Sequence, residues 1–523
     1  MPAIPRTPIA LAVGLVSLCA AFGPQAFQSA SSSPFQPAVP RIWDDQAMSM
    51  LELPLANPIG SARHAPANYY YKIPVRAIYK SYPIYEPGHE PRGYMKWLKA
   101  RQPLIVWDAT HRPPLQTRED WIRAGEMVFD SSTFFYNLDA TLDQVRSPDW
   151  YQTVGVPVTA NGVMPFERYV IRKKGAIEVS GNSCATCHTR VMPDGSVVKG
   201  AQGNFPLDRN VAYRYRAGVA HSNNPAEALR DVRNNERYLY AAPWVQPDLL
   251  ADLDTLTVQQ IALRHDRIPP GVIARHGTSV VNPAQVPDLI GVQSRRYLDR
   301  TGLQQHRTIA DLMRYAALNQ GGDALSSFDG FIPADYGTFK KLPDPSDPDN
   351  GERYSDEQLY ALALYLYSLA PPANPNRFDA RAARGQKVFE RSGCLVCHTP
   401  PLYSNNKLTL AEGFTPPSGA AEKYDVMPFS VGTDPGLAMT TRRGTGYYKV
   451  PSLKGVWYRS MFGHGGWCAT LEDWFDPRRL RDDYVPTGFN PNGNAPYPVK
   501  GHPFGLDLNE EDRRALVAFL KTL

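Results

Sequence analysis

The sequence predicts a mainly α-helical protein made of two fused, related domains with large loop insertions, preceded by an extended N-terminal arm. Two observations indicate this architecture. The pattern Cys-x-x-Cys-His occurs twice, at residues 184–188 and 394–398, and the blocks of sequence around it recur in the same order in both halves of the chain. The 523 residues, 43% of them hydrophobic, provide room for two to four domains with apolar cores.

The Cys-x-x-Cys-His pattern is the attachment signal of c-type haem. Its two thiols add to the haem vinyl groups, and the adjacent histidine ligates the iron from one face. A zinc site would need more cysteines or paired histidines nearby, and a thioredoxin-like dithiol does not need the histidine. We therefore predict two covalently bound haem c groups, each in a cytochrome c-like domain. The predicted attachment residues are Cys184, Cys187, Cys394 and Cys397, and the predicted proximal iron ligands are His188 and His398.

The repeated blocks define the two predicted domains, 119–371 and 372–523, which a proline-rich linker at 370–375 joins. The last matched block of each half has a Ser or Asn cap, acidic residues in the first turn and apolar residues at helical spacing, and therefore predicts a C-terminal helix. The matched pairs are 123–129 with 383–389, 286–292 with 450–456, 308–312 with 470–474, and 355–366 with 509–520.

The first half is the longer one because it carries insertions around its haem motif. Residues 154–179 within it alternate in polarity between glycines and predict a β-hairpin. Extra chain around the first haem suits a substrate pocket better than a simple electron carrier. This asymmetry is the first indication that the two haems differ in role.

The N-terminus predicts export. Residues 1–30 resemble a signal peptide, with Arg6 before an apolar run at 9–21 that is too short to cross a bilayer comfortably; an uncleaved anchor is the alternative. No other segment predicts a membrane span. Residues 31–118 are rich in Pro and Tyr without a persistent period, and predict an arm that wraps the following domain. We expect a bacterial periplasmic or secreted protein.

Charge and cysteine content exclude other classes. The formal charge of +5 has no block of like charges, so no nucleic-acid partner is expected. Of the six cysteines, four lie in the haem motifs and Cys19 in the leader. Cys468 is then left without a disulfide partner, and is predicted to be a small buried residue.

The sixth iron ligand separates an electron-transfer haem from a reactive one. The stretch before the last helix of the second half contains His502, whereas the matching stretch at 322–354 contains no His, Met or Cys. We therefore predict that His502 ligates the second iron and that the first iron has an open site. The competing ligands are Met439, Met427 and His464.

Haem propionates also need partners. We favour a propionate hydrogen bond for His464 over iron ligation. Arg442 and Arg443 are candidates because guanidinium groups bind carboxylates with two hydrogen bonds; solvated loop charges are the alternative interpretation.

The order of these blocks resembles the bacterial di-haem cytochrome c peroxidase superfamily, including the maturation enzyme of methylamine dehydrogenase and the di-haem rubber oxygenases. The resemblance covers about residues 120–523, and its most specific parts are 448–456, 462–466 and 470–472. It implies a reactive N-terminal haem and an electron-transfer C-terminal haem. The Gly-His-x-Phe-Gly stretch around His502 is most similar to the rubber-oxygenase branch. An interdomain calcium ion is also implied, without ligands that can be named.

Two departures from the resemblance put peroxidase activity in question. Leu298 stands where these peroxidases have a bridging Trp, and residues 318–322 lack the Glu that assists peroxide cleavage. A peroxidatic site needs a distal acid–base. The unassigned candidates for this role are His221, His265, His276, His306 and Glu167.

These observations predict an exported di-haem c-type oxidoreductase. The first haem would activate peroxide or dioxygen, and the second would relay electrons, with a small electron-donor protein as a partner. One alternative is a dioxygenase that cleaves an apolar, polyisoprene-like substrate without external electrons. The other is a non-enzymatic di-haem electron carrier with both irons six-coordinate.

Overall fold

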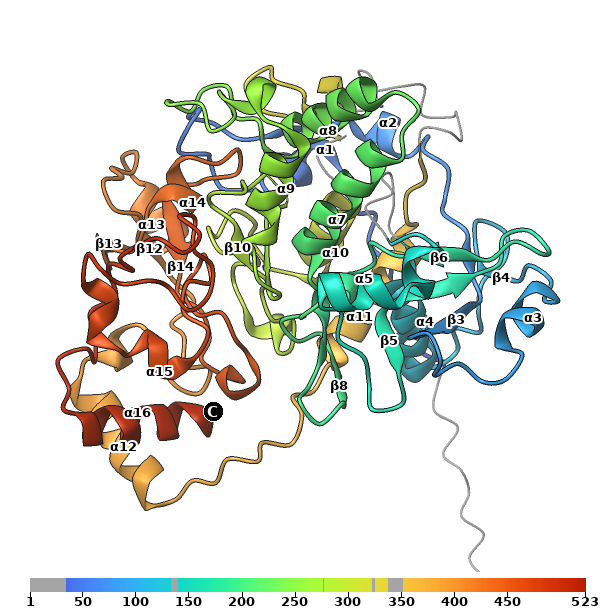
Figure 1. Cartoon of the computed structure of the whole chain (residues 1–523). Helices are drawn as coiled ribbons and strands as arrows, with labels where there is room; N and C mark the ends of the chain where they lie inside the picture. The colour runs from blue at the N-terminus through green and yellow to red at the C-terminus, as the bar shows by residue number, and fades with distance from the viewer. Residues whose placement is uncertain (1–33, 133–139, 276, 322–324, 337–350) are drawn as a thin grey trace, which may run out of the picture.

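The computed structural model describes residues 34–132, 140–275, 277–321, 325–336 and 351–523 (Figure 1). These residues form sixteen α-helices and fourteen short strands. Helix is the larger component, as predicted, although the sheets of two or three strands are more numerous than the sequence indicated. The predicted signal peptide, 1–30, lies outside the described residues.

Two helix pairs repeat the same packing in the two halves. In the first half α4 (Arg118–Asp130) packs on α11 (Asp356–Ser368), and in the second α12 (Ala380–Arg391) packs on α16 (Glu510–Lys521). Each pair joins the first and last matched blocks of its half. The predicted caps are present, since the Ser355 hydroxyl accepts from the N–H of Gln358 and the Asn509 side chain accepts from that of Asp512.

A glycine at each helix crossing lets the two backbones approach closely. A Cβ on Gly125 would stand 2.0 Å from the carbonyl oxygen of Ala361, and one on Gly385 would stand 1.9 Å from that of Ala515. Both pairs occupy equivalent positions in the repeat. Because only glycine lets the backbones approach this far, the two halves share one packing solution as well as one sequence pattern.

The insertion of the first half forms a separate group of elements. Its hairpin is confirmed, since β5 pairs antiparallel with β6. The elements of the first half between the paired helices are α5 (Pro148–Val154), β5 (Val163–Val170), β6 (Glu178–Ser180), α6 (Cys184–His188), β7 (Thr189–Val191), β8 (Val197–Lys199), α7 (Leu207–Ala220), α8 (Pro225–Tyr240), α9 (Val258–Asp266), β9 (Val272–Ile273), β10 (Ala284–Gln285), α10 (Ile309–Gly321) and β11 (Ser326–Ser327).

The N-terminal segment contains more regular structure than an extended arm. Its strand β3 pairs with β5 as a sheet edge, and the period-2 burial of β3 explains the pairing. Trp43, Tyr70 and Ile78 join the core around α4, α10 and α11. The elements are α1 (Asp45–Ser49), β1 (Arg63–His64), α2 (Ala67–Tyr70), β2 (Ile78–Tyr79), β3 (Ser81–Tyr85), α3 (Tyr94–Lys99) and β4 (Ile105–Trp107).

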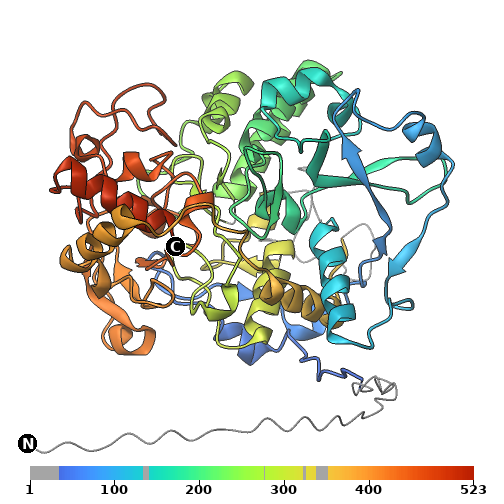
Figure 2. The same ribbon diagram turned by 90° about the horizontal axis from the view of Figure 1, so that it is seen from below.

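The second half is smaller and contains one three-stranded sheet. Figure 2 shows it, in orange to red, on one side of the molecule, with the insertion of the first half on the other. Its own core lies around α12, α15 and α16. Its remaining elements are β12 (Leu408–Leu410), α13 (Ala420–Tyr424), β13 (Val426–Ser430), α14 (Gly436–Met439), β14 (Tyr447–Lys449) and α15 (Leu471–Trp474).

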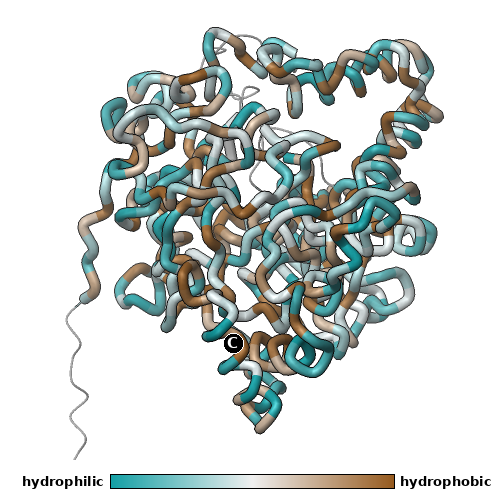
Figure 3. The backbone as a smooth tube through the Cα atoms, turned by 90° about the vertical axis from the view of Figure 1, so that its left-hand side faces the viewer, coloured by the Kyte–Doolittle hydropathy of each residue, from teal (hydrophilic) through white to brown (hydrophobic). Residues whose placement is uncertain are grey.

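Apolar and polar residues are mixed along the backbone tube in Figure 3. Within the described ranges, no helix combines the length and the hydropathy that crossing a bilayer requires. Cys468 is completely buried, as predicted.

Candidate functional site

The second Cys-x-x-Cys-His motif forms a tight turn. Gly393, with φ +75°, starts a 3₁₀-helix over Cys394–Val396, and the N–H of His398 donates to the carbonyl of Cys394 at 2.8 Å. Burial lowers the pKa of His398. Its Nδ1 lies 3.1 Å from the carbonyl oxygen of Tyr403, which favours the proton on Nδ1 and leaves Nε2 free as an iron ligand.

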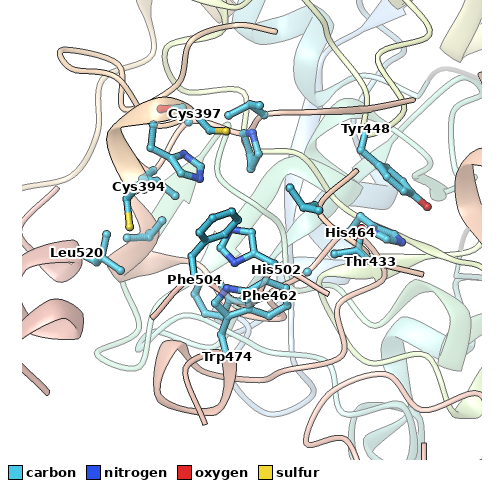
Figure 4. Close-up of a pocket in the computed structure, with 18 of the residues that line it drawn as sticks. Cys394, Cys397, Thr433, Tyr448, Phe462, His464, Trp474, His502, Phe504 and Leu520 are labelled. Carbon is cyan, nitrogen blue, oxygen red and sulfur yellow. The ribbon is translucent and has the colours of Figure 1, made fainter. Parts of the chain in front are cut away.

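A mainly apolar cavity of about 380 Å³ opens beside this motif. Figure 4 shows Cys394 and Cys397 at one wall, with His502, Phe504 and Trp474 opposite. The walls are formed by the motif, by α15 and α16, and by the loop before α16.

His502 faces His398 across this cavity. Their ring centroids are 6.5 Å apart, and two imidazoles that ligate one metal from opposite faces, at metal–nitrogen distances of about 2.0–2.1 Å, have centroids roughly 6–6.5 Å apart. His502 Nδ1 is buried without a hydrogen-bond partner. Burial, with His398 and Arg479 adding to it, lowers the pKa of His502 to about 3, so the ring is neutral, as a ligand must be. The residues present therefore fit a covalently held haem.

The loop that carries His502 is strained and braced. His502 has φ +44°, a left-handed conformation that non-glycine residues rarely adopt. The fully buried Arg479 donates to the carbonyls of Gly501 at 3.0 Å and His502 at 2.8 Å. The N–H of His502 donates to Val431 at 2.6 Å. This bracing holds the imidazole in the cavity.

The competing ligands have other surroundings. Met427 Sδ is 3.8 Å from Cys397 Sγ, beside the attachment residues, and Met439 packs in a separate apolar cluster with Tyr448. His464 lines the cavity, with its ring stacked on that of Tyr448 at 4.0 Å between centroids. Its Nε2 is buried without a partner, so the propionate hydrogen bond expected of it stays a prediction.

The prediction of Arg442 as a propionate partner is wrong. This fully buried guanidinium donates to the backbone carbonyls of Tyr238, Leu239 and Ala241. It is neither a solvated loop charge nor available to a cofactor carboxylate. Arg443 is also buried. Burial raises the pKa of the nearby Glu52, but His64, and after it Arg443, outweigh burial and lower this pKa.

The first motif forms helix α6, which begins with a capping box between Ser183 and Thr186. The Thr186 hydroxyl also donates to the carbonyl of Phe166 in β5 at 3.2 Å, so the inserted hairpin positions the motif. Burial lowers the pKa of His188 to about 4, which leaves a neutral ring. A hydrogen bond with the backbone of Pro287 partly opposes the lowered pKa of His188, and one with the backbone of Pro451 does the same at His398. These two prolines are equivalent in the repeat. The donor set again fits haem c.

Two candidate histidines of the first half do not present a free nitrogen to an iron. His265 is fully buried, with Nδ1 2.8 Å from Asp208 and Nε2 3.0 Å from Glu236. In His306, Nδ1 is 2.8 Å from the carbonyl of Arg295 and Nε2 is 2.6 Å from the Tyr367 hydroxyl.

The remaining candidates have different surroundings. His221 is exposed at the end of α7. Glu167 is buried in β5, and His276 lies outside the described residues. Leu298, at the position of the bridging Trp, is a buried core residue.

Arg275 is a residue near the first motif that the sequence did not indicate. It donates to the Asn182 side chain at 2.5 Å, two residues before Cys184. Burial raises the pKa of the Cys187 thiol, while Arg275 opposes the shift. The N–H of Ala274 donates to Asp208, so the buried Asp208–His265–Glu236 triplet holds the loop that carries Arg275.

Among the described residues, no group of three or more His, Cys, Asp or Glu side chains is arranged to hold a metal ion. The calcium ion implied by the resemblance therefore has no ligand set of this kind in that part of the chain.

No family model matches the chain, and no curated protein does. Solved structures that resemble it include a hydrazine synthase of Kuenenia stuttgartiensis, with 17% identity over 60% of this chain and 92% of that one, at a TM-score of 0.28. A MauG-like protein associated with microbial copper homeostasis shares 17% identity over 46% and 75% of the two chains, at 0.27. The diheme peroxidase BthA from Burkholderia thailandensis shares 18% over 64% and 92%, at 0.25.

A MauG-like protein and a diheme peroxidase are thus among the solved structures with which the chain aligns. The TM-scores are low, and the function is therefore inferred below from the residues of this chain.

Proposed function

We propose that the protein is an exported di-haem c-type oxidoreductase with two unlike haems. The first, attached at Cys184 and Cys187, would have an open site for peroxide or dioxygen. The second, attached at Cys394 and Cys397, would be six-coordinate and would pass electrons. Haem supplies the redox chemistry, and the chain supplies ligands, a dry environment and counter-charges.

The observation that carries this proposal is the placement of the histidines. His502 faces His398 at ligation distance across the cavity beside the second motif. In the first half, both ring nitrogens of His265 and His306 lie against other groups, and His221 is exposed. Two strong axial ligands favour electron transfer, whereas a vacant position favours reaction with a small molecule.

The protein's own residues prepare the two sites differently. At the second site Arg479 holds the strained His502 loop, so the ligand loses little freedom on binding. At the first site Arg275 and the buried triplet form a charged wall beside Cys187. A charged, buried wall of this kind suits chemistry that moves protons.

Electron spin resonance of the resting ferric protein tests the proposal. We expect one low-spin and one high-spin or water-bound haem, and cyanide should titrate only the high-spin one. Two equivalent low-spin haems would favour the electron carrier. Turnover of peroxide with a reduced donor is expected, whereas cleavage of an apolar substrate by dioxygen without a donor would favour the oxygenase.

A further inference from the structure

A second, smaller cavity of about 100 Å³ lies between the two candidate haem sites. Two loops that are equivalent in the repeat form its walls, 287–295 from the first half and 451–459 from the second. Each loop includes the proline whose backbone hydrogen-bonds to a predicted proximal histidine, Pro287 to His188 and Pro451 to His398. The cavity therefore lies next to both predicted iron ligands.

Basic side chains dominate the walls of this cavity. Arg295 and Arg459, which lie three residues beyond the matched blocks, fold back in the same way, each donating to the carbonyl of its own loop at Asp288 or Ser452. The basic wall residues are Arg295, Arg300, Lys449, Lys454 and Arg459, and the only acidic residue among the wall residues is Asp288. Arg300, Lys449 and Arg459 also line the larger cavity of the second motif.

These cations have few negative partners: besides Asp288, Asp299 acts on Arg300 and Lys449. Arg300 donates to the carbonyls of Gln285 and Val286, and Lys449 to those of Tyr297 and Leu298. Arg459 Nε lies 3.2 Å from Asp288, but its Nη2 is buried without a hydrogen-bond partner, and the side chain is only 9% exposed.

The wall thus carries an excess of positive charge. Asp288 already accepts from the Tyr458 hydroxyl at 2.8 Å and from the N–H of Ile290 at 2.9 Å. Burial and the neighbouring Arg459 and Arg295 lower the pKa of Arg300 to about 9, and burial with Arg300 lowers that of Lys449. Buried charges persist when they are paired. A bound anion would therefore stabilise this wall.

We propose that the cavity is a carboxylate-binding site that receives haem propionate groups from the two attachment motifs, an inference that rests on the proposed function. The two-pronged guanidinium of Arg459 suits a carboxylate, and the cavity is next to both motifs. The same positive charge would favour the ferrous over the ferric state, because added positive charge disfavours the more oxidised iron.

Three variants of the full haem-loaded protein test this site: Arg459→Gln, Arg300→Gln and Arg459→Lys. Arg481→Gln is the matched control, since Arg481 is exposed and paired with Asp483 at the surface. Intact mass first establishes that the wild type and each variant carry both haems, so a wild type without two haems counts against the proposed function and not against the site.

We expect the Gln variants to lower a haem midpoint potential, by about 59 mV if the ferric-to-ferrous ratio changes tenfold. They should also shift a carboxylate band in the redox-difference infrared spectrum, and Arg459→Lys, which keeps the charge, should restore most of the potential. An unshifted carboxylate band in both fully loaded Gln variants would overturn the proposal. So would a wild-type potential that depends on added acetate, because a free anion would then occupy the site.

Discussion

At the scale of single residues, His502 combines burial, strain and a free nitrogen. Its φ of +44° is maintained by Arg479 and by the bond to Val431. A strained loop that directs a neutral imidazole at another histidine has a functional explanation, since strain persists where the surroundings enforce it.

Replacing His502 with Ala should convert the second haem to a high-spin form that binds imidazole or cyanide. The reason is that His398 would remain as the only strong ligand. Optical and spin-resonance spectra measure this change, and the first haem should be unaffected. His64→Ala is the matched control, because His64 lies in the first half against Glu52 and Ser326. A low-spin signal retained in His502→Ala would direct attention to His464.

The buried His265 should make stability depend on pH. Burial alone would lower its pKa, but Glu236 and Asp208 outweigh burial and raise it to about 10. A folded-state pKa above the unfolded value of about 6.5 means that the stabilisation is complete below pH 6.5 and is lost as pH rises towards 10.

The variant His265→Gln should therefore melt well below the wild type at pH 6, with a loss on the order of 3 kcal/mol. The difference should narrow as pH rises to 9.5. Melting curves across this range measure this difference. His221→Gln, at an exposed position at the end of α7, should match the wild type throughout. A difference that is constant with pH would contradict the charged triplet.

At the scale of secondary-structure elements, the crossed helix pairs define each half. The same glycine contact occurs at α4–α11 and at α12–α16. Because these contacts join the ends of each predicted domain, they close the chain around its haem motif.

Adding a methyl group at Gly385 should force α12 and α16 apart. The new Cβ would stand 1.9 Å from the carbonyl oxygen of Ala515, which is backbone and cannot rotate away. We expect Gly385→Ala to lower the free energy of unfolding by about 3 kcal/mol, measured by denaturant titration. Gly218→Ala is the control, because a Cβ in that exposed helical position meets nothing within 4 Å and should be neutral or stabilising. Equal stability of both variants would refute the close crossing.

At the scale of the whole molecule, the two halves meet at the equivalent loops 287–295 and 451–459. The basic cavity lies on this seam, and the core around α7 and α9 also takes in Trp467 and Phe489 from the second half. The relative position of the two haem sites is therefore a property of the complete chain.

The intact mass of the purified protein should exceed that of the mature polypeptide by two haems. Acid extraction should leave both attached, because thioether bonds are covalent. Cys394→Ala with Cys397→Ala should reduce the excess to one haem and remove the low-spin signal. A wild-type mass with one haem or none would defeat the proposed function as a whole.

Local patterns determined the features of this protein that depend on neighbouring residues. The two Cys-x-x-Cys-His turns, the caps at Ser355 and Asn509 and the hairpin that contains β5 and β6 all follow from short-range spacing. The repeat also paired Gly125 with Gly385, because both helix crossings require the same close approach.

Only the tertiary structure decided which distant side chains meet. His398 and His502 are far apart in sequence, and the repeat could suggest their meeting but not the 6.5 Å between their rings. Arg442 was mistaken for a propionate partner because a sequence does not show which carbonyls a guanidinium will reach. Arg459 and Arg300 were overlooked although Arg459 has an equivalent in Arg295, since charge in a loop gains meaning only when folding buries it beside other charge.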